Sequence, residues 1–192
     1  MIMKHLVVIF LSMLTLAACS DDNNYVIEGA LYGGTSFEGE TIYLVPFVNA
    51  TEEDVDSATI HNGRFRFEGS IDGNEMCILR MRPMMKLFIK ELIFVKEPGH
   101  ISTLLSKTSY AKGTPLNDSL QAWNQYKSGI DSISIAINKA VKRAADDEEL
   151  LKKLQLKSDS LRLAFDKHNR QVVENNDNAF GRYIEKFAKF SK

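Results

Sequence analysis

Cysteine is scarce in this chain: only Cys19 and Cys77 occur among its 192 residues. Two cysteines this far apart form no Cys-x-x-Cys redox pair and no zinc-ribbon spacing. They also provide no disulfide framework of the kind that stabilises small secreted domains. Cys77 lies in the apolar run Met76–Leu79, where a small buried core residue is the expected role. A reactive thiol at this position is the alternative.

An excess of one charge sign is also missing, since 24 basic residues stand against 25 acidic ones and the net charge is −1. Such a balance lacks the electrostatic footprint of a nucleic-acid-binding protein, so no nucleic acid partner is expected. The glycine-rich stretch Gly33–Gly39 could cradle a phosphate, but no Lys-Ser or Lys-Thr pair follows it. Because neither nucleotide-binding fingerprint is present, we expect a plain loop there.

Catalytic and metal-binding patterns are missing from the sequence as well. His61, His100 and His168 fall in three different predicted elements, without His-x-His or His-x-x-x-His spacing, whereas metal ligands must converge. We expect His168 to be a packed or partly exposed structural residue. The chain contains no Gly-x-Ser-x-Gly elbow and no P-loop. The sequence therefore predicts no metal site, no cofactor and no enzymatic activity.

No apolar run is long enough to cross a bilayer, which takes about 20 helical residues. The N-terminal run Leu6–Leu16 is shorter and has the form of a signal peptide. It ends in Leu16-Ala17-Ala18-Cys19, which resembles the lipobox of bacterial lipoproteins. The resemblance implies that the signal peptidase recognises Leu16, Ala17 and Ala18, and that Cys19 then carries diacylglycerol on its sulfur and an acyl chain such as palmitate on its amine. An unmodified Cys19 is the alternative.

The start of the chain is thus expected to consist of a lipoprotein signal peptide, residues 1–18, and a short polar tether, residues 19–24. Ser20, Asp21 and Asp22 in the tether are similar to the signal that exports some Gram-negative lipoproteins to the outer face of the outer membrane. We therefore expect a lipid-anchored protein of the cell envelope, held in the outer membrane and facing either the periplasm or the cell surface.

The stretch Val55–Gly69 gives the strongest local structure signal. Asn62-Gly63 separates two alternating runs, which is typical of a hairpin with a two-residue type I′ turn. Side chains alternate between the two faces of a strand, so Ala58, Ile60, Phe65 and Phe67 share an apolar face. In this hairpin Ile60 is expected to lie opposite Phe65, and Ala58 opposite Phe67.

Residues 25–112 are predicted to form a β-domain. Seven short segments with turn signals between them read as strands: Tyr25–Leu31, Ile42–Val48, 56–61, 64–69, Met76–Met81, Leu87–Val95 and Ile101–Leu105. This pattern predicts an antiparallel β-sandwich or open barrel.

Residues 113–192 are predicted to be helical. Thr114 can cap a helix and Pro115 fits its first turn, and the chain contains no later proline. Two apolar stripes with helical spacing follow, the first formed by Leu116, Leu120, Trp123, Ile130, Ile133, Ile137 and Val141, the second by Leu150, Leu154, Leu161, Phe165, His168 and Val172. Asp146–Glu149 is interpreted as an acidic helix start rather than a pair of catalytic carboxylates.

Each predicted helix holds about 30 residues and would be roughly 45 Å long. Matched lengths predict a long antiparallel helical hairpin, with one continuous helix as the alternative, and Phe180–Phe190 is expected to form a short last helix. The predicted fold class is therefore α+β.

Several pieces of the sequence, taken in order, resemble the N-terminal β-domain of envelope thiol–disulfide interchange lipoproteins, a domain of unknown function that precedes a thioredoxin-like domain. The pieces are Tyr25–Gly29, Ile42–Leu44, Val55–Gly69, Val95–Ile101 and Gly113–Asp118, and residues 175–183 resemble the connecting region. The chain departs from that pattern because it contains no counterpart of the family's redox Cys-x-x-Cys.

Two classes of function follow from these observations. The first is a non-catalytic envelope lipoprotein, an accessory module that binds a protein partner or a ligand through the β-domain or the helical region. The second is a thiol–disulfide component that acts through Cys77 or with a separate thioredoxin-like partner. A truncated remnant of such a redox protein is a further alternative.

Overall fold

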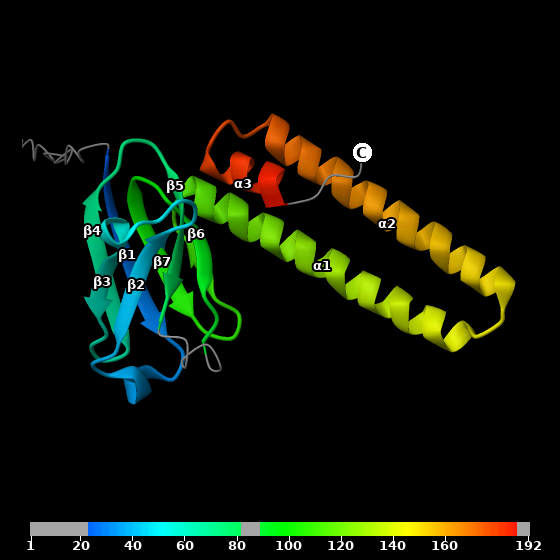
Figure 1. Cartoon of the computed structure of the whole chain (residues 1–192), viewed down its shortest axis with the longest axis horizontal. Coiled ribbons are helices and arrows are strands. Elements are labelled where there is room, and N and C mark those ends of the chain that lie inside the picture. Colours follow the sequence, from blue (N-terminus) through cyan, green and yellow to red (C-terminus); the bar gives the residue numbers. More distant parts are fainter. Residues whose placement is uncertain (1–22, 82–88, 188–192) are drawn as a thin grey trace, which may run out of the picture.

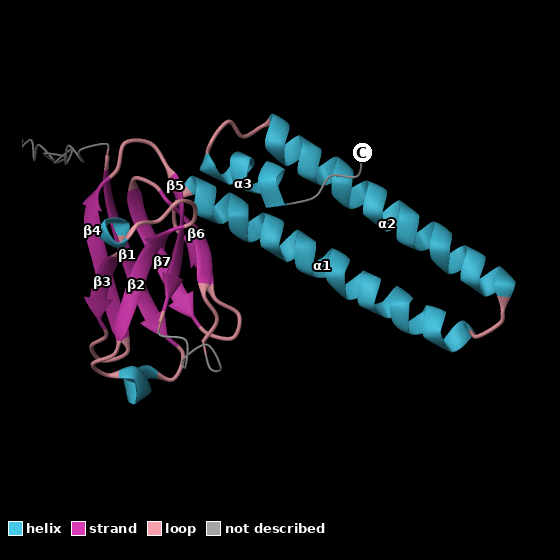
Figure 2. Ribbon diagram, in the orientation of Figure 1, coloured by secondary structure: helices cyan, strands magenta, loops and turns pink. Residues whose placement is uncertain are grey.

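The computed structural model describes residues 23–81 and 89–187. These residues form two four-stranded β-sheets and a long helical hairpin that projects away from them (Figure 1). Sheet A has the strand order β4 (Arg64–Ser70), β1 (Asn24–Leu31), β7 (Gly99–Leu105), β8 (Tyr110–Lys112). Sheet B has the order β3 (Asp56–Thr59), β2 (Thr41–Pro46), β5 (Glu75–Arg80), β6 (Leu92–Lys96). The predicted α+β class is confirmed, and the described strands close no barrel (Figure 2).

The strands differ from the prediction in three details. The described part of the chain has eight strands, because the three-residue strand β8 was too short to give a sequence signal. β1 pairs with β7 in parallel, so sheet A is not purely antiparallel. The predicted strand Leu87–Val95 corresponds to β6, which begins at Leu92, and residues 87 and 88 lie outside the described residues.

The turn at Asn62-Gly63 is confirmed, but the hairpin ladder predicted on both sides of it is wrong. Both residues have positive φ, 52° and 68°, and the main chains of His61 and Arg64 exchange two hydrogen bonds of 2.9 Å. Beyond this single bridge the strands separate, since β3 pairs with β2 and β4 pairs with β1. The turn is therefore a corner that carries the chain from sheet B to sheet A.

The predicted apolar face of this segment is nevertheless correct. Ile60, Phe65 and Phe67 are buried in the core between the sheets, and Ala58 packs against that core. Cys77 lies in the same core, as predicted. Burial follows from the alternation of side chains along each strand, which is the same whether the two strands pair with each other or with different neighbours.

Two glycines allow this corner to form. A Cβ on Gly63 would lie 2.7 Å from the Cα of Gly34, because the glycine-rich loop, which contains the short 3-10 helix η1 (Gly34–Phe37), packs against the turn. A Cβ on Gly29 would lie 1.9 Å from the ring of Phe65, its register partner on β4. The loop at Gly33–Gly39 thus has a structural role in packing.

The helix α1 (Pro115–Ala144) is joined to the sandwich through buried polar groups. One carboxylate oxygen of Glu97 accepts hydrogen bonds from the main-chain N–H groups of Leu116 (2.9 Å) and Asn117 (3.1 Å). Thr114 occupies the predicted N-cap position, but its side chain makes no capping bond to the helix main chain. Glu97 therefore satisfies the first N–H groups of α1, a role expected for the cap residue itself.

The predicted antiparallel helical hairpin is confirmed by α1 and α2 (Glu148–Glu174), which lie side by side (Figure 1). Asp147 caps α2 by accepting from the N–H of Leu150 at 3.0 Å, as the acidic helix start predicted. Three residues of the predicted stripes, Ile133, Val141 and Leu150, are exposed. The hairpin buries only a narrow seam of each helix, and these three side chains lie outside it.

A second apolar core holds the base of the hairpin against sheet B. It contains Met76, Val95, Leu120, Trp123, Ala179, Phe180 and Ile184. The last three residues belong to α3 (Ala179–Phe187), and the predicted residues beyond 187 lie outside the described part. The indole N–H of Trp123 donates to Oδ1 of Asn169 at 2.8 Å, which fixes α1 against α2.

Candidate functional site

The predicted lipidation residue Cys19, and Leu16, Ala17 and Ala18 before it, lie outside the described residues. No helix within residues 23–81 and 89–187 is both long and apolar enough to cross a membrane.

Cys77 is fully buried in the core of the sandwich. Burial raises the pKa of its thiol to about 12, while the nearby Lys96 ammonium opposes the rise and the Glu75 carboxylate adds to it. The sulfur lies 3.8 Å from a carboxylate oxygen of Glu75, which disfavours a thiolate further. Of the two arginines that follow in sequence, Arg80 is exposed and Arg82 lies outside the described residues.

The three histidines of the described residues lie at separate places. His61 contacts Glu38, with Nδ1 and Oε1 3.2 Å apart, and the other oxygen of Glu38 accepts from the N–H of Asn62 at 2.6 Å. The ring of His168 lies 4.1 Å from the ring of Tyr126, in agreement with a packed structural role. In the described part of the chain, no group of three or more His, Cys, Asp or Glu side chains could hold a metal ion.

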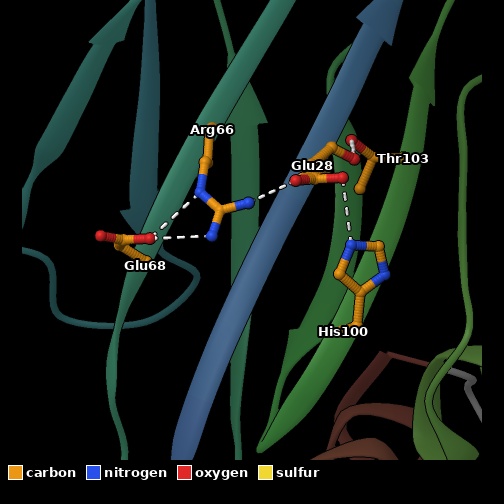
Figure 3. A network of polar contacts seen from close by, with 5 residues as sticks. All are labelled: Glu28, Arg66, Glu68, His100 and Thr103. Atoms are coloured by element: carbon orange, nitrogen blue, oxygen red, sulfur yellow. Dashed lines mark hydrogen bonds and ion pairs between the residues drawn. The ribbon is translucent and has the colours of Figure 1, made fainter.

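A polar network on the outer face of sheet A connects three adjacent strands (Figure 3). Glu28 on β1 binds Arg66 on β4 with one carboxylate oxygen and Nε2 of His100 on β7, at 3.1 Å, with the other. Arg66 also binds Glu68, with Nη2 and Oε2 2.9 Å apart. Thr103 donates its hydroxyl to the main-chain oxygen of Glu28 at 3.3 Å. Four charged or titratable side chains are thus held in one orientation on an uncovered sheet face.

The network changes the acidity of its central members. The hydrogen bond from His100, together with the charges of His100 and Arg66, holds the pKa of Glu28 below its usual value. The bond to Glu68 holds the pKa of Arg66 above its usual value. Because all of these side chains are about half exposed or more, water screens their attraction and the contribution to stability is small.

We expect the variant Glu28→Gln to be slightly less stable than the wild type at pH 7 and equally stable at low pH. A lowered folded-state pKa means that the carboxylate stabilises the fold above the unfolded pKa of about 4.3 and loses this contribution as the pH falls through the folded value. Urea unfolding at pH 7, 5 and 3 measures the difference. Glu53→Gln, an exposed carboxylate on the short turn η2 (Glu52–Asp54), is the control. A difference in stability between Glu28→Gln and the wild type that persists unchanged at pH 3 would contradict a stabilising role of the Glu28 carboxylate.

Sequence reasoning did not find Glu28, Glu38, Glu97 or Asn117 as members of these contacts. Their partners in these contacts lie 19 to 75 residues away in the chain, so no local pattern connects them. The one available signal was the alternation along β1 and β7, which places Glu28 and His100 at outward positions. It does not reveal that these strands are neighbours.

Several hollows mark the surface. One of about 290 Å³ lies between β5 and α3 and is lined by Met76, Tyr183 and Arg182 among others. Another of about 420 Å³ lies between β6 and α1, with Ile93 and Asn124 in its walls. An open hollow of about 540 Å³ lies beside Arg66 and the polar network. These shapes can bind a partner chain or a small polar ligand.

The comparison with known protein families gives one match. A family described as a domain of unknown function (DUF4369) matches residues 25–120, which contain the sandwich from Tyr25 onward and the first six residues of α1. No match to the chain was found among curated proteins. Because the match covers half of the 192 residues, the protein belongs to the family defined by this domain of unknown function.

Proposed function

We propose that the protein is a non-catalytic, lipid-anchored module of the cell envelope that binds a partner protein. The lipobox-like sequence ending in Cys19 supports the anchor. The resemblance to the N-terminal part of thiol–disulfide interchange lipoproteins supports an accessory role. In this proposal the tether connects the sandwich to the membrane, and the helical hairpin, which projects from the sandwich, binds the partner.

The observation that carries the binding role is a pair of exposed leucines on α2. Leu156 and Leu163 are 60% and 58% exposed. They stand seven residues apart and therefore lie on one side of the helix. The opposite side of α2, with Phe165, already packs against α1. A single exposed leucine is ordinary, whereas two in register form a stripe on which another helix can pack.

The charges beside the stripe specify the partner further. Lys152, Lys153 and Lys167 flank the two leucines in the helical register, and all three side chains are exposed. An amphipathic helix of a partner protein, with leucine-like residues in its centre and acidic residues at its edges, would complement this surface.

The test places a photo-crosslinking amino acid at Ser160, between the two leucines, in living cells. We expect an adduct with one envelope protein, and we expect the double variant Leu156→Ser, Leu163→Ser to remove it. Both substitutions are at exposed positions, so they should change the free energy of unfolding by no more than about 0.5 kcal/mol each. The crosslinker at Ser70, at the end of β4, is the control. No adduct at Ser160, or equal adducts at both positions, would refute the role of the hairpin.

The alternative function, thiol–disulfide exchange through Cys77, predicts a reactive thiol. We expect the opposite, because exchange requires a thiolate and the pKa of Cys77 is raised to about 12. In a Cys19→Ser background, Cys77 should react with a disulfide reagent at least about a hundredfold more slowly in the folded protein than in guanidinium. The same protein should not reduce insulin. Fast reaction of the folded protein, together with insulin reduction that Cys77→Ser abolishes, would favour the redox function.

A further inference from the structure

The edge strand β6 exposes main-chain groups at one residue. Phe47 donates its N–H to the carbonyl of Met76, so Met76 and, by alternation, Ile78 turn their main-chain groups toward β2. Cys77 and Leu79 therefore turn toward β6, where they are in register with Phe94 and Leu92. Ile93 and Val95, the alternate residues of β6, must then present their N–H and C=O groups to the free edge of sheet B.

Both ends of this edge are already covered. The side-chain amide of Asn117 binds both the N–H of Val95 (3.0 Å) and its carbonyl (2.7 Å), as a neighbouring strand would. At the other end, Lys90 donates its N–H to the carbonyl of Ser106 at 3.0 Å and accepts at its own carbonyl from the hydroxyl of Ser109 at 2.9 Å. Ile93 lies between them and lines the hollow of about 420 Å³.

The opposite wall of that hollow is rich in carboxamides. Gln121, Asn124, Gln125 and Ser128 on α1 all line it, and their spacing of three, four and seven residues places them on one face of the helix. A carboxamide can donate and accept hydrogen bonds at the same time, which is what the peptide bonds of a bound main chain require. Leu120 and Tyr183 supply the apolar part of the wall.

The charged side chains at the hollow favour one kind of peptide sequence as its ligand. Two basic residues, Lys90 and Lys107, and one acidic residue, Glu91, line the hollow. Both lysines are exposed. The excess of positive charge favours a ligand with acidic side chains.

We propose that this hollow holds an extended, acidic peptide segment of a partner protein, which adds to the free edge of β6 at Ile93. Strand addition of this kind takes its affinity from main-chain hydrogen bonds and its specificity from alternate side chains. The inference rests on the proposed binding role, but at a surface other than the leucine stripe of α2.

The test uses the purified full chain and a fluorescent heptapeptide of alternating valine and glutamate, with binding measured by fluorescence anisotropy. We expect this acidic peptide to bind. A valine–lysine peptide of the same length should bind at least about tenfold more weakly. N-methylation of alternate residues along one edge of the peptide should abolish binding, because it removes the N–H group that pairs with the free carbonyl of Ile93. N-methylation along the other edge should change the affinity by less than about threefold.

Charge reversal locates the site. The double variant Lys90→Glu, Lys107→Glu should weaken binding by about tenfold or more, whereas the matched control Lys139→Glu, Lys142→Glu, at exposed positions far along α1, should leave it unchanged. No binding of the acidic peptide, equal binding of the two N-methylated peptides, or equal weakening by both double variants overturns the proposal. The variant Leu156→Ser, Leu163→Ser should keep full peptide binding. Failure of the peptide test with an intact crosslink at Ser160 would remove only this inference, and the reverse result would remove only the role of the hairpin.

Discussion

Cells that produce the Cys19→Ala variant are expected to incorporate no clickable palmitate into this protein, and to release it from the membrane into the soluble fraction. The loss should be complete because the sulfur of Cys19 is the proposed attachment point for the diacylglycerol, and the other cysteine, Cys77, is buried in the core. Each buried methylene of an acyl chain contributes about 0.8 kcal/mol to membrane binding, so several chains hold a protein firmly and none leaves it free.

The control for this experiment is Cys77→Ser, which changes the only other cysteine. That variant should be labelled and fractionated like the wild type if it folds. Equal palmitate incorporation in the wild type and the Cys19→Ala variant would refute lipidation at Cys19 and, with it, the membrane anchor in the proposed function.

The second large effect concerns the stability of the corner at Asn62-Gly63. Phe67→Ala should lower the free energy of unfolding by about 3–5 kcal/mol, because this ring is 3% exposed in the core between the sheets. Gly63→Ala should lower it by about 2–4 kcal/mol. The new methyl group would sit at a φ of 68° and lie 2.7 Å from the main chain of Gly34, where neither a rotamer change nor open space can relieve the contact.

Gly129→Ala is the matched control, because it makes the same chemical change at a place without these constraints. Gly129 lies inside α1, and a Cβ there would meet nothing within 4 Å. Alanine should therefore raise stability by about 0.5–1 kcal/mol. Urea denaturation of the three variants and the wild type measures the changes in the free energy of unfolding and so tests their signs and their order. A Gly63→Ala variant as stable as Gly129→Ala would show that the turn does not pack against the glycine-rich loop.

Local patterns predicted which side chains are buried more reliably than which strands are neighbours. Alternation and apolar context place Phe65, Phe67 and Cys77 in the core, and all three are buried there. The pairing of Ile60 with Phe65 was wrong, because the same Asn-Gly turn fits a hairpin and a corner between two sheets equally well. Its geometry constrains only the residues beside it.

The candidate sites depended even more on contacts between distant parts of the chain. The carboxylate of Glu28 and the ring of His100 are in contact only because β1 lies next to β7 in sheet A. The free edge of β6 is limited to Ile93 because Asn117 covers Val95 and Ser106 and Ser109 cover Lys90. No spacing or periodicity in the sequence encodes either arrangement.

By itself, the sequence determined the lipobox-like motif at the N-terminus, the α+β order of the elements, the turn at Asn62-Gly63 and the start of α2 at Asp146–Glu149. Each of these depends on residues within a few positions of one another, where side-chain chemistry and main-chain geometry act directly. Only the tertiary structure decided that the turn joins two sheets, that Gly29 must leave room for Phe65, and that Glu97 rather than Thr114 caps α1. These outcomes depend on which distant segments bury their apolar faces together, and that choice is made by the packing of the whole chain rather than by any short stretch of it.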